Sequence, residues 1–140
     1  MAEYTSDSVQ TVSSGQNILF TETPVAGTRC IQHRSGSGLV TLRGLTNQSN
    51  ARFLITFGAN AAIPTGQTVG SLSAAISISG EPINNTTMIV TPADVEEYFN
   101  ISSSTYVIVP KGCCITIAVK NTSAIPIEIQ NANLIVTRVS

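Results

Sequence analysis

The sequence predicts an all-β protein, an antiparallel sandwich or barrel, from three observations. Apolar and polar residues alternate with a period of two along most of the 140-residue chain. Turn signals rich in Gly, Pro, Asn and Ser separate the alternating segments about every ten residues. Polarity comes mainly from Ser, Thr, Asn and Gln, because charged residues are only 11% of the chain. β-Branched residues with small uncharged neighbours suit pleated, half-buried surfaces, and the length fits one domain.

The first alternating segment is residues 17–23, where Ile18 and Phe20 fall on one face of an expected strand. The sequence SGSG at residues 35–38 predicts a tight hairpin turn, because Gly and Ser accept the backbone angles of such turns. Residues 39–44 then continue as a second strand. The two-residue period returns immediately after each turn signal, which favours strands joined by short connections.

Residues 51–59 predict a central strand with Phe53, Ile55 and Phe57 on one face. Residues 71–79 alternate Leu, Ala and Ile with Ser and predict the next strand. The remaining strands are expected at residues 105–110, 113–121, 125–131 and 132–139.

Three segments depart from the alternation. Residues 91–100 carry Pro92 and early acidic residues, which predict a short helical turn, with a wide loop as the alternative. Residues 1–15 read as an extended N-terminal arm for attachment to a partner, followed by a domain over residues 16–140. Residues 58–70 read as a long connection of small residues and are a candidate contact surface.

The adjacent cysteines at positions 113 and 114 raise the question of metal or redox chemistry. Neighbouring side chains of a strand point to opposite faces, so Cys113 and Cys114 are not placed to hold one ion together. Both are therefore expected to be small, inert and mostly buried packing residues. A disulfide from Cys30 to either of them stays open at this stage.

No catalytic or metal-binding constellation is apparent, so the chain is expected to be a non-enzyme without a cofactor. His33 is the only histidine, and the serines near it lack the strand-to-helix context of a nucleophile. The acidic residues of segment 91–100 favour complementing a helix start, with glycoside chemistry or a cation as alternatives. Turn residues remain as candidate contacts for a ligand or partner, a glycan or an anion among them. They are His33, Arg34, Asn84 and Asn85.

The charge balance limits the partners. A net charge of −1 favours neither nucleic acid nor an anionic membrane. The apolar runs are short and interrupted, and no basic region precedes an apolar one near residue 1. We therefore expect synthesis in the cytoplasm without a classical signal peptide.

Four stretches together resemble a known superfamily. They are TVSSGQNILFTETPV, ARFLITFGA, YVIVPKGCCITIAVKNTS and NANLIVTRVS. The combination resembles the jelly-roll superfamily of tumour necrosis factor and complement globular heads over residues 9–139. It is most similar to the bacterial and phage branch, including the C-terminal domains of collagen-like exosporium proteins. That family's collagen-like repeat is missing here, and Phe53 stands where it often has Tyr.

The resemblance implies an antiparallel jelly-roll β-sandwich that assembles as a homotrimer, with subunits packed edge against face around a threefold axis. Candidate core or axis residues are Phe53, Phe57, Ile115, Ile117 and Val119. The expected function is structural, on the surface of a virion (head decoration or fibre component) or spore, attached to a larger capsid, fibre or spore coat through the N-terminal arm. A receptor- or glycan-binding head domain of a phage fibre or bacterial surface protein is the alternative.

Overall fold

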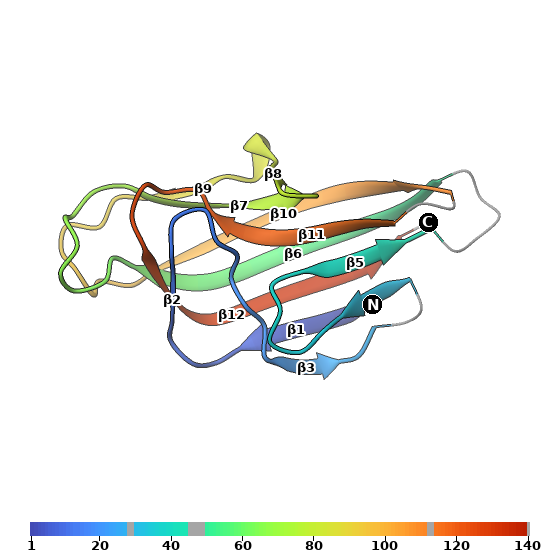
Figure 1. The fold of residues 1–140 in the computed structure, drawn as a ribbon, viewed down its shortest axis with the longest axis horizontal. Coiled ribbons are helices and arrows are strands. Elements are labelled where there is room, and N and C mark those ends of the chain that lie inside the picture. The colour runs from blue at the N-terminus through green and yellow to red at the C-terminus, as the bar shows by residue number, and fades with distance from the viewer. Residues whose placement is uncertain (28–29, 45–49, 112–113, 140) are drawn as a thin grey trace.

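The computed structural model describes residues 1–27, 30–44, 50–111 and 114–139, and it shows two antiparallel sheets stacked as a sandwich (Figure 1). Sheet A has the strand order β10-β6-β12-β1-β3, with β2 also paired to β12. Sheet B has the order β4-β5-β11-β7-β8, with β9 also paired to β7. The all-β jelly-roll sandwich predicted from the sequence is confirmed.

The elements, in chain order, are β1 (Ala2–Ser6), β2 (Gln10–Val12), β3 (Glu22–Val25), β4 (Ile31–His33), β5 (Val40–Arg43), β6 (Asn50–Ala62), β7 (Leu72–Ile78), β8 (Glu81–Pro82), the 3-10 turn η1 (Asn84–Thr86), β9 (Met88–Val90), β10 (Phe99–Pro110), β11 (Cys114–Asn121) and β12 (Ile127–Arg138).

The core lies between the two sheets and follows the alternation of the sequence. In β6, Phe53, Ile55 and Phe57 are fully buried, while the intervening residues are at least partly accessible. Sheet B supplies the opposite wall of the core through residues such as Leu72 and Val119. Because side chains of a strand alternate between faces, one apolar layer is sufficient to bind the two sheets.

The N-terminal residues differ from the expected arm. β1 is an interior strand of sheet A, because it pairs with β12 on one side and β3 on the other. Ala2 and Tyr4 point into the core and are 0% and 2% exposed. Buried and partly exposed residues alternate along β1. The pattern is short and contains only two apolar residues among charged and hydroxyl ones, so it was not recognised as a strand from the sequence. Residues 2–6 are therefore structural.

The expected helical turn at residues 91–100 is wrong, because this segment is an irregular connection that enters β10 at Phe99. Pro92 is buried there, and Glu96 adopts a left-handed conformation with φ of 59°. The alternative of a loop is the correct one. Among the described residues the helical element is the 3-10 turn η1. The described part of the chain has no helix that is long and apolar enough to cross a bilayer.

The connection expected at residues 58–70 is shorter than predicted. Gly58 to Ala62 continue β6, and Ile63 is fully buried behind them. Only the turn that begins at Pro64 is a loop, closed by a hydrogen bond from the Gln67 amide to the Pro64 carbonyl. Small residues of a long strand were mistaken for loop residues because Gly and Ala have low strand propensity.

Candidate functional site

The hairpin of β4 and β5 carries the only histidine. His33 pairs with Val40, and the turn between them is closed by a 3.0 Å hydrogen bond from the Ser37 amide to the Arg34 carbonyl. This confirms the hairpin predicted from residues 35–38. The His33 Nε2 lies 2.8 Å from the Ser37 carbonyl oxygen. A carbonyl only accepts, so Nε2 donates this bond. In the neutral ring Nδ1 is therefore the unprotonated nitrogen, which can only accept a hydrogen bond. It is buried and has no hydrogen-bond partner among the described residues.

Aromatic rings fix the position of this imidazole. The Tyr4 ring centroid lies 4.4 Å from that of His33, and Phe20 meets the same ring edge-on at 6.3 Å. Burial raises the pKa of the Tyr4 phenol. The site is therefore an aromatic corner where β1 of sheet A meets β4 of sheet B.

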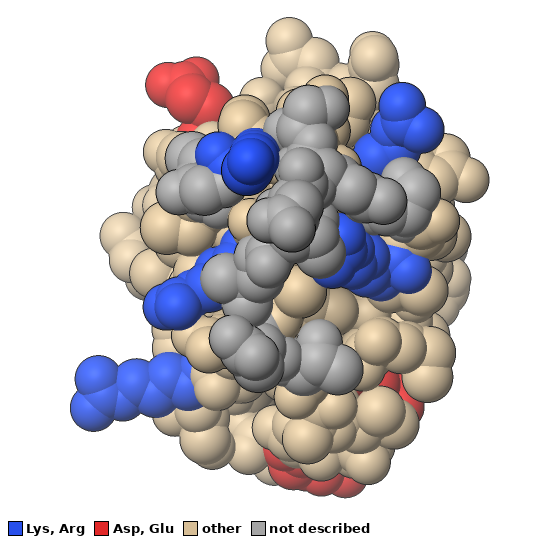
Figure 2. All heavy atoms as spheres, turned by 90° about the vertical axis from the view of Figure 1, so that its right-hand side faces the viewer, with Lys and Arg blue, Asp and Glu red and all other residues tan. Residues whose placement is uncertain are grey.

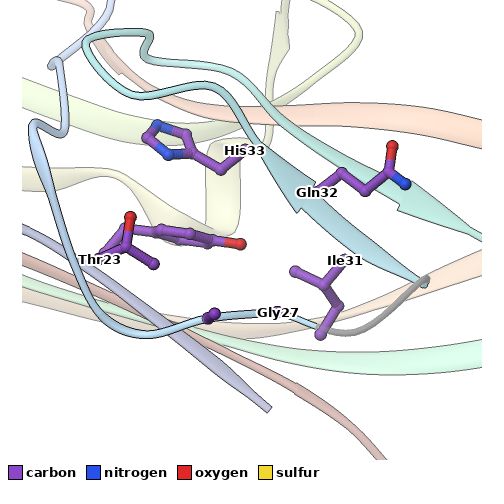
Figure 3. Close-up of a pocket in the computed structure, with 7 residues that line it drawn as sticks. Thr23, Gly27, Ile31, Gln32 and His33 are labelled. Atoms are coloured by element: carbon purple, nitrogen blue, oxygen red, sulfur yellow. The ribbon is translucent and has the colours of Figure 1, made fainter.

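A cavity of about 710 Å³ opens beside this corner, between the edge strands β3 and β4. It is lined by Tyr4, Thr23, Ala26, Gly27, Ile31, Gln32 and His33. In Figure 3, Ile31 lies beside Gly27, and Gln32 extends away from both. A Cβ atom on Gly27 would stand 2.3 Å from the Ile31 carbonyl oxygen, so only glycine lets this connection pass so close to β4.

A second hollow of about 450 Å³ adjoins the first on the outer side of the hairpin. It shares Gln32 and His33 with the larger cavity and adds Arg34, Ser37, Leu39 and Thr41. The two hollows together present hydroxyl, amide, imidazole and guanidinium groups near an aliphatic floor. Such a surface suits an uncharged polyhydroxylated ligand or a small anion.

The other predicted ligand contacts lie elsewhere. Asn84 and Asn85 are exposed on η1, beside β8 and β9. β4 and β8 are opposite edges of sheet B, so these asparagines do not join His33 and Arg34 in one site. The structure instead adds Tyr4, Thr23 and Gln32, which sequence reasoning missed because they belong to three separate strands.

A carboxyl pair occupies the far end of the sandwich. The Tyr98 hydroxyl donates a 2.8 Å hydrogen bond to Glu128, and Glu96 accepts hydrogen bonds from the Thr65 amide and hydroxyl. A hydrogen bond from Glu128 and the bond from the Thr65 amide lower the pKa of Glu96. Burial and the neighbouring Glu96 raise the pKa of Glu128. Burial and Glu128 raise the pKa of Tyr98 to about 12. The group fastens the connection before β10 to β12 and to the turn after β6.

The residues proposed as core or axis residues prove to be core residues. Phe53, Phe57, Ile117 and Val119 are at most 1% exposed within the single chain, and Ile115 is partly buried. The four fully buried side chains therefore pack within one subunit.

The cysteine predictions have different outcomes. Cys114 is exposed at the start of β11, so the expectation that it is buried is wrong for this residue. It shares the outer face with Thr116 and pairs with Arg43 at the end of the strand, where little covers it. No disulfide joins Cys30 to Cys114, and Cys113 lies outside the described residues. The Cys30 sulfur accepts a hydrogen bond from Arg138 at 3.4 Å.

The outer face of sheet A is uncharged over its centre. Tyr106 and Ile108 of the edge strand β10 are 67% and 55% exposed. Tyr106 pairs with Leu54 of β6, which in turn pairs with Thr137 of β12. We call this surface the β10 face. Its central members are Leu54, Thr56, Ser102, Ser104, Tyr106, Ile108, Ile135 and Thr137.

Within the described residues, no three side chains of His, Cys, Asp or Glu converge as a metal site.

No family model and no curated protein matches the sequence, whereas solved structures match the fold. The globular domain of zebrafish complement 1qA protein aligns with a TM-score of 0.72 at 11% identity, over 99% of this chain and 96% of its own. The Eiger TNF of S. frugiperda gives 0.72 at 9% identity, over 99% and 91%. Murine APRIL gives 0.56 at 11%, over 92% and 98%. The chain therefore has the complement 1q and tumour necrosis factor type of jelly roll.

Proposed function

We propose, from this fold, that the protein is a structural surface-display domain, a homotrimer that decorates a virion as a head or fibre component or coats a spore. The β10 face carries the proposal. It is an uncharged surface across β10, β6 and β12, bordered by Arg52 beside Ile108 and by Glu3 beside Ile135, with Tyr106 and Ile108 more than half exposed. Large exposed apolar side chains on one face, here Tyr106 and Ile108, are typical of a protein–protein contact.

The edge of sheet A supplies the second half of such a contact. β10 is twelve residues long and has an unpaired edge, which in an isolated subunit is a template for aggregation. Packing the β10 edge of one subunit onto the β10 face of the next protects both, and three copies close the ring. The resemblance to the tumour necrosis factor superfamily implies the same edge-against-face trimer.

The trimer is tested by size-exclusion chromatography with light scattering. We expect Tyr106→Glu to convert the trimer to a folded monomer at micromolar concentration, because it places a charge in a desolvated contact. Ile89→Glu is the matched control, since Ile89 is 66% exposed but lies on β9 of sheet B. A monomeric wild-type protein, or equal dissociation in both variants, would contradict the trimer.

The display role needs a test of its own. We expect antibodies against the folded trimer to label the surface of intact virions or spores in immunogold microscopy. Labelling confined to the interior of the particles, or to neither particle, would contradict the role on these surfaces while leaving the trimer intact.

A sugar-binding role is the second candidate, and the paired hollows at His33 favour it. Gln32, Arg34 and Thr41 place hydrogen-bonding groups side by side on the outer surface of one hairpin. We expect a glycan array to give hits that Gln32→Ala with Arg34→Ala removes and Asn84→Ala with Asn85→Ala leaves unchanged. An array without hits would remove this candidate.

A further inference from the structure

Two hollows meet at the β4–β5 hairpin, and they differ in the groups that they offer. The larger one lies between β3 and β4 and reaches Tyr4 of β1. The smaller one lies on the outer side of the hairpin and includes Arg34. Gln32 and His33 line both, so a ligand of two rings can occupy both hollows at once. The His33 ring is held by Ser37 and Tyr4, so the shared wall is preorganised.

The Tyr4 hydroxyl is the recognition group of the larger hollow. Tyr4 is 2% exposed, and its hydroxyl has no hydrogen-bond partner among the described residues. Gly27, which also lines the hollow, lies against this hydroxyl, because a Cβ atom on Gly27 would stand 3.0 Å from the Tyr4 oxygen. A polar group of a buried side chain is unfavourable without a partner, so a ligand hydroxyl that pairs with it is stabilised.

The free edge of β4 adds backbone groups to the same hollow. The Arg43 amide donates a 2.9 Å hydrogen bond to the Cys30 carbonyl across the β4–β5 ladder. Bonded and non-bonded positions alternate along an antiparallel pair, so Ile31 and His33 direct their N–H and C=O groups away from β5. Because β4 is the edge strand of sheet B, these groups face the hollow between β3 and β4. Donors and acceptors at fixed positions suit the neighbouring hydroxyls of a sugar ring.

Arg34 gives the smaller hollow a positive charge. It is exposed on the turn after β4 and forms no ion pair among the described residues. Gln32 and Thr41 line the same hollow with uncharged hydrogen-bonding groups. A guanidinium is a planar fork of donors that matches a carboxylate with two hydrogen bonds. The smaller hollow therefore suits a sugar ring that carries a carboxylate.

We propose that the paired hollows bind an acidic oligosaccharide, with a hydroxylated ring against Tyr4 and the β4 edge and a carboxylate-bearing ring against Arg34. The inference rests on the sugar-binding role proposed above, and it adds the class of sugar and the two side chains that select it. The Tyr4 hydroxyl contributes affinity for any sugar that enters the larger hollow. The ion pair with Arg34 separates acidic sugars from neutral sugars of the same shape.

Isothermal titration calorimetry of the intact protein tests the class of sugar. The probes are sialyllactose and trigalacturonate, each compared with its methyl ester, which keeps the shape and removes the charge. We expect each acid to bind about tenfold more tightly than its ester, because a hydrogen bond between charged groups is stronger than a neutral one. The preference should shrink at about 500 mM NaCl, because salt screens the charge of an exposed arginine.

Arg34→Gln should remove the preference for the acids and leave the affinity for the methyl esters unchanged. Figure 2 shows further Lys and Arg side chains at the end of the sandwich that lies to the right in Figure 1, and these also attract anions. Arg52→Gln is the matched control, because Arg52 lies near the start of β6 and lines neither hollow. An equal loss of preference in both variants would assign the effect to general charge and overturn the proposal.

Tyr4→Phe tests the larger hollow. It removes only the hydroxyl and keeps the ring that packs on His33, so the variant should stay folded in thermal denaturation. We expect it to bind the acids and the methyl esters alike about tenfold more weakly. Tyr106→Phe is the control, since Tyr106 lies on the β10 face and should leave sugar binding unchanged. Full affinity in folded Tyr4→Phe would overturn the contact with the larger hollow.

The outcomes separate the two proposals. Equal binding of the acids and their esters, or glycan-array hits that are all neutral sugars, overturns the acidic class and leaves the sugar-binding role standing. An array without hits, with no binding of either probe, overturns both. An acidic array hit other than the two probes is titrated against its own methyl ester and judged in the same way.

Discussion

Asn121 links β2 to the connection between β11 and β12 at one end of the sandwich. It is 0% exposed, and its amide donates hydrogen bonds to the Val12 and Ile125 carbonyls at 2.9 and 3.0 Å. Its side-chain oxygen accepts the Ser123 amide at 2.9 Å, and the Ser123 hydroxyl in turn bridges to Ser73. One buried side chain thus satisfies two carbonyls and one amide of the backbone.

We expect Asn121→Ala to lower the free energy of unfolding by about 2–4 kcal/mol, because it leaves two carbonyls and one amide buried without partners. Chemical denaturation measures the change. Asn100→Ala is the control, since Asn100 is exposed and makes one long hydrogen bond of 3.5 Å. Equal stability of both variants would show that water replaces the Asn121 contacts.

Single residues also show where sequence reasoning reaches its limit. The burial of Phe53 and Phe57 follows from alternation within one strand and was predictable. The exposure of Cys114 was not, because the face of a residue near a strand end depends on what covers it. Tyr4 in the cavity beside His33 was equally out of reach, since the two residues lie 29 positions apart.

Among the elements, β1 has the largest consequence for stability. Its residues were expected to form an arm, yet it holds β12 and β3 together in sheet A. We expect Tyr4→Ala to cost about 3–5 kcal/mol, because Tyr4 is 2% exposed and packs on His33. Thermal and chemical denaturation report the loss.

The neighbouring substitution is the control for β1. Thr5→Ala should stay within about 0.5 kcal/mol, because the Thr5 side chain faces outward and it is the backbone carbonyl that accepts the hydrogen bond from the Thr21 amide. If Tyr4→Ala were as stable as Thr5→Ala, residues 2–6 would not be an integral strand in solution.

The connection before β10 gives the sandwich a pH dependence. The pKa of Glu128 is raised in the folded state, so its contribution is present below the ordinary carboxyl value of 4.5 and is lost as pH rises through the raised pKa. The pKa of Glu96 is lowered, so its contribution is present above 4.5 and is lost as pH falls through the lowered pKa. The pair therefore stabilises the fold most between these two pKa values.

We expect Glu128→Gln to remove the loss of stability that occurs as pH rises through the raised pKa of Glu128. An uncharged amide can accept a hydrogen bond from Tyr98 and donate one to Glu96 at every pH. Urea denaturation from pH 3 to pH 7 measures the profile, and Glu97→Gln is the control one residue from Glu96. An unchanged alkaline limb in the Glu128 variant would show that the pair does not share a proton.

Across the whole molecule, the sequence was sufficient for the architecture and insufficient for the surfaces. The two-residue period identifies strands and their inward faces, because one slip would expose an entire apolar row. The cavity at His33 and the β10 face each combine side chains from several strands. Which strands become neighbours depends on the crossovers of the jelly roll, and no local pattern records them.

The pairing of β1 with β12 has a consequence for biosynthesis. Residues 2–6 are synthesised long before their partners at positions 132–136. Sheet A therefore cannot be completed until β12 has been translated, and until then β1 has only β3 as a partner strand. One edge of β1 therefore stays unpaired on the nascent chain during that time, and unpaired strand edges are prone to aggregation.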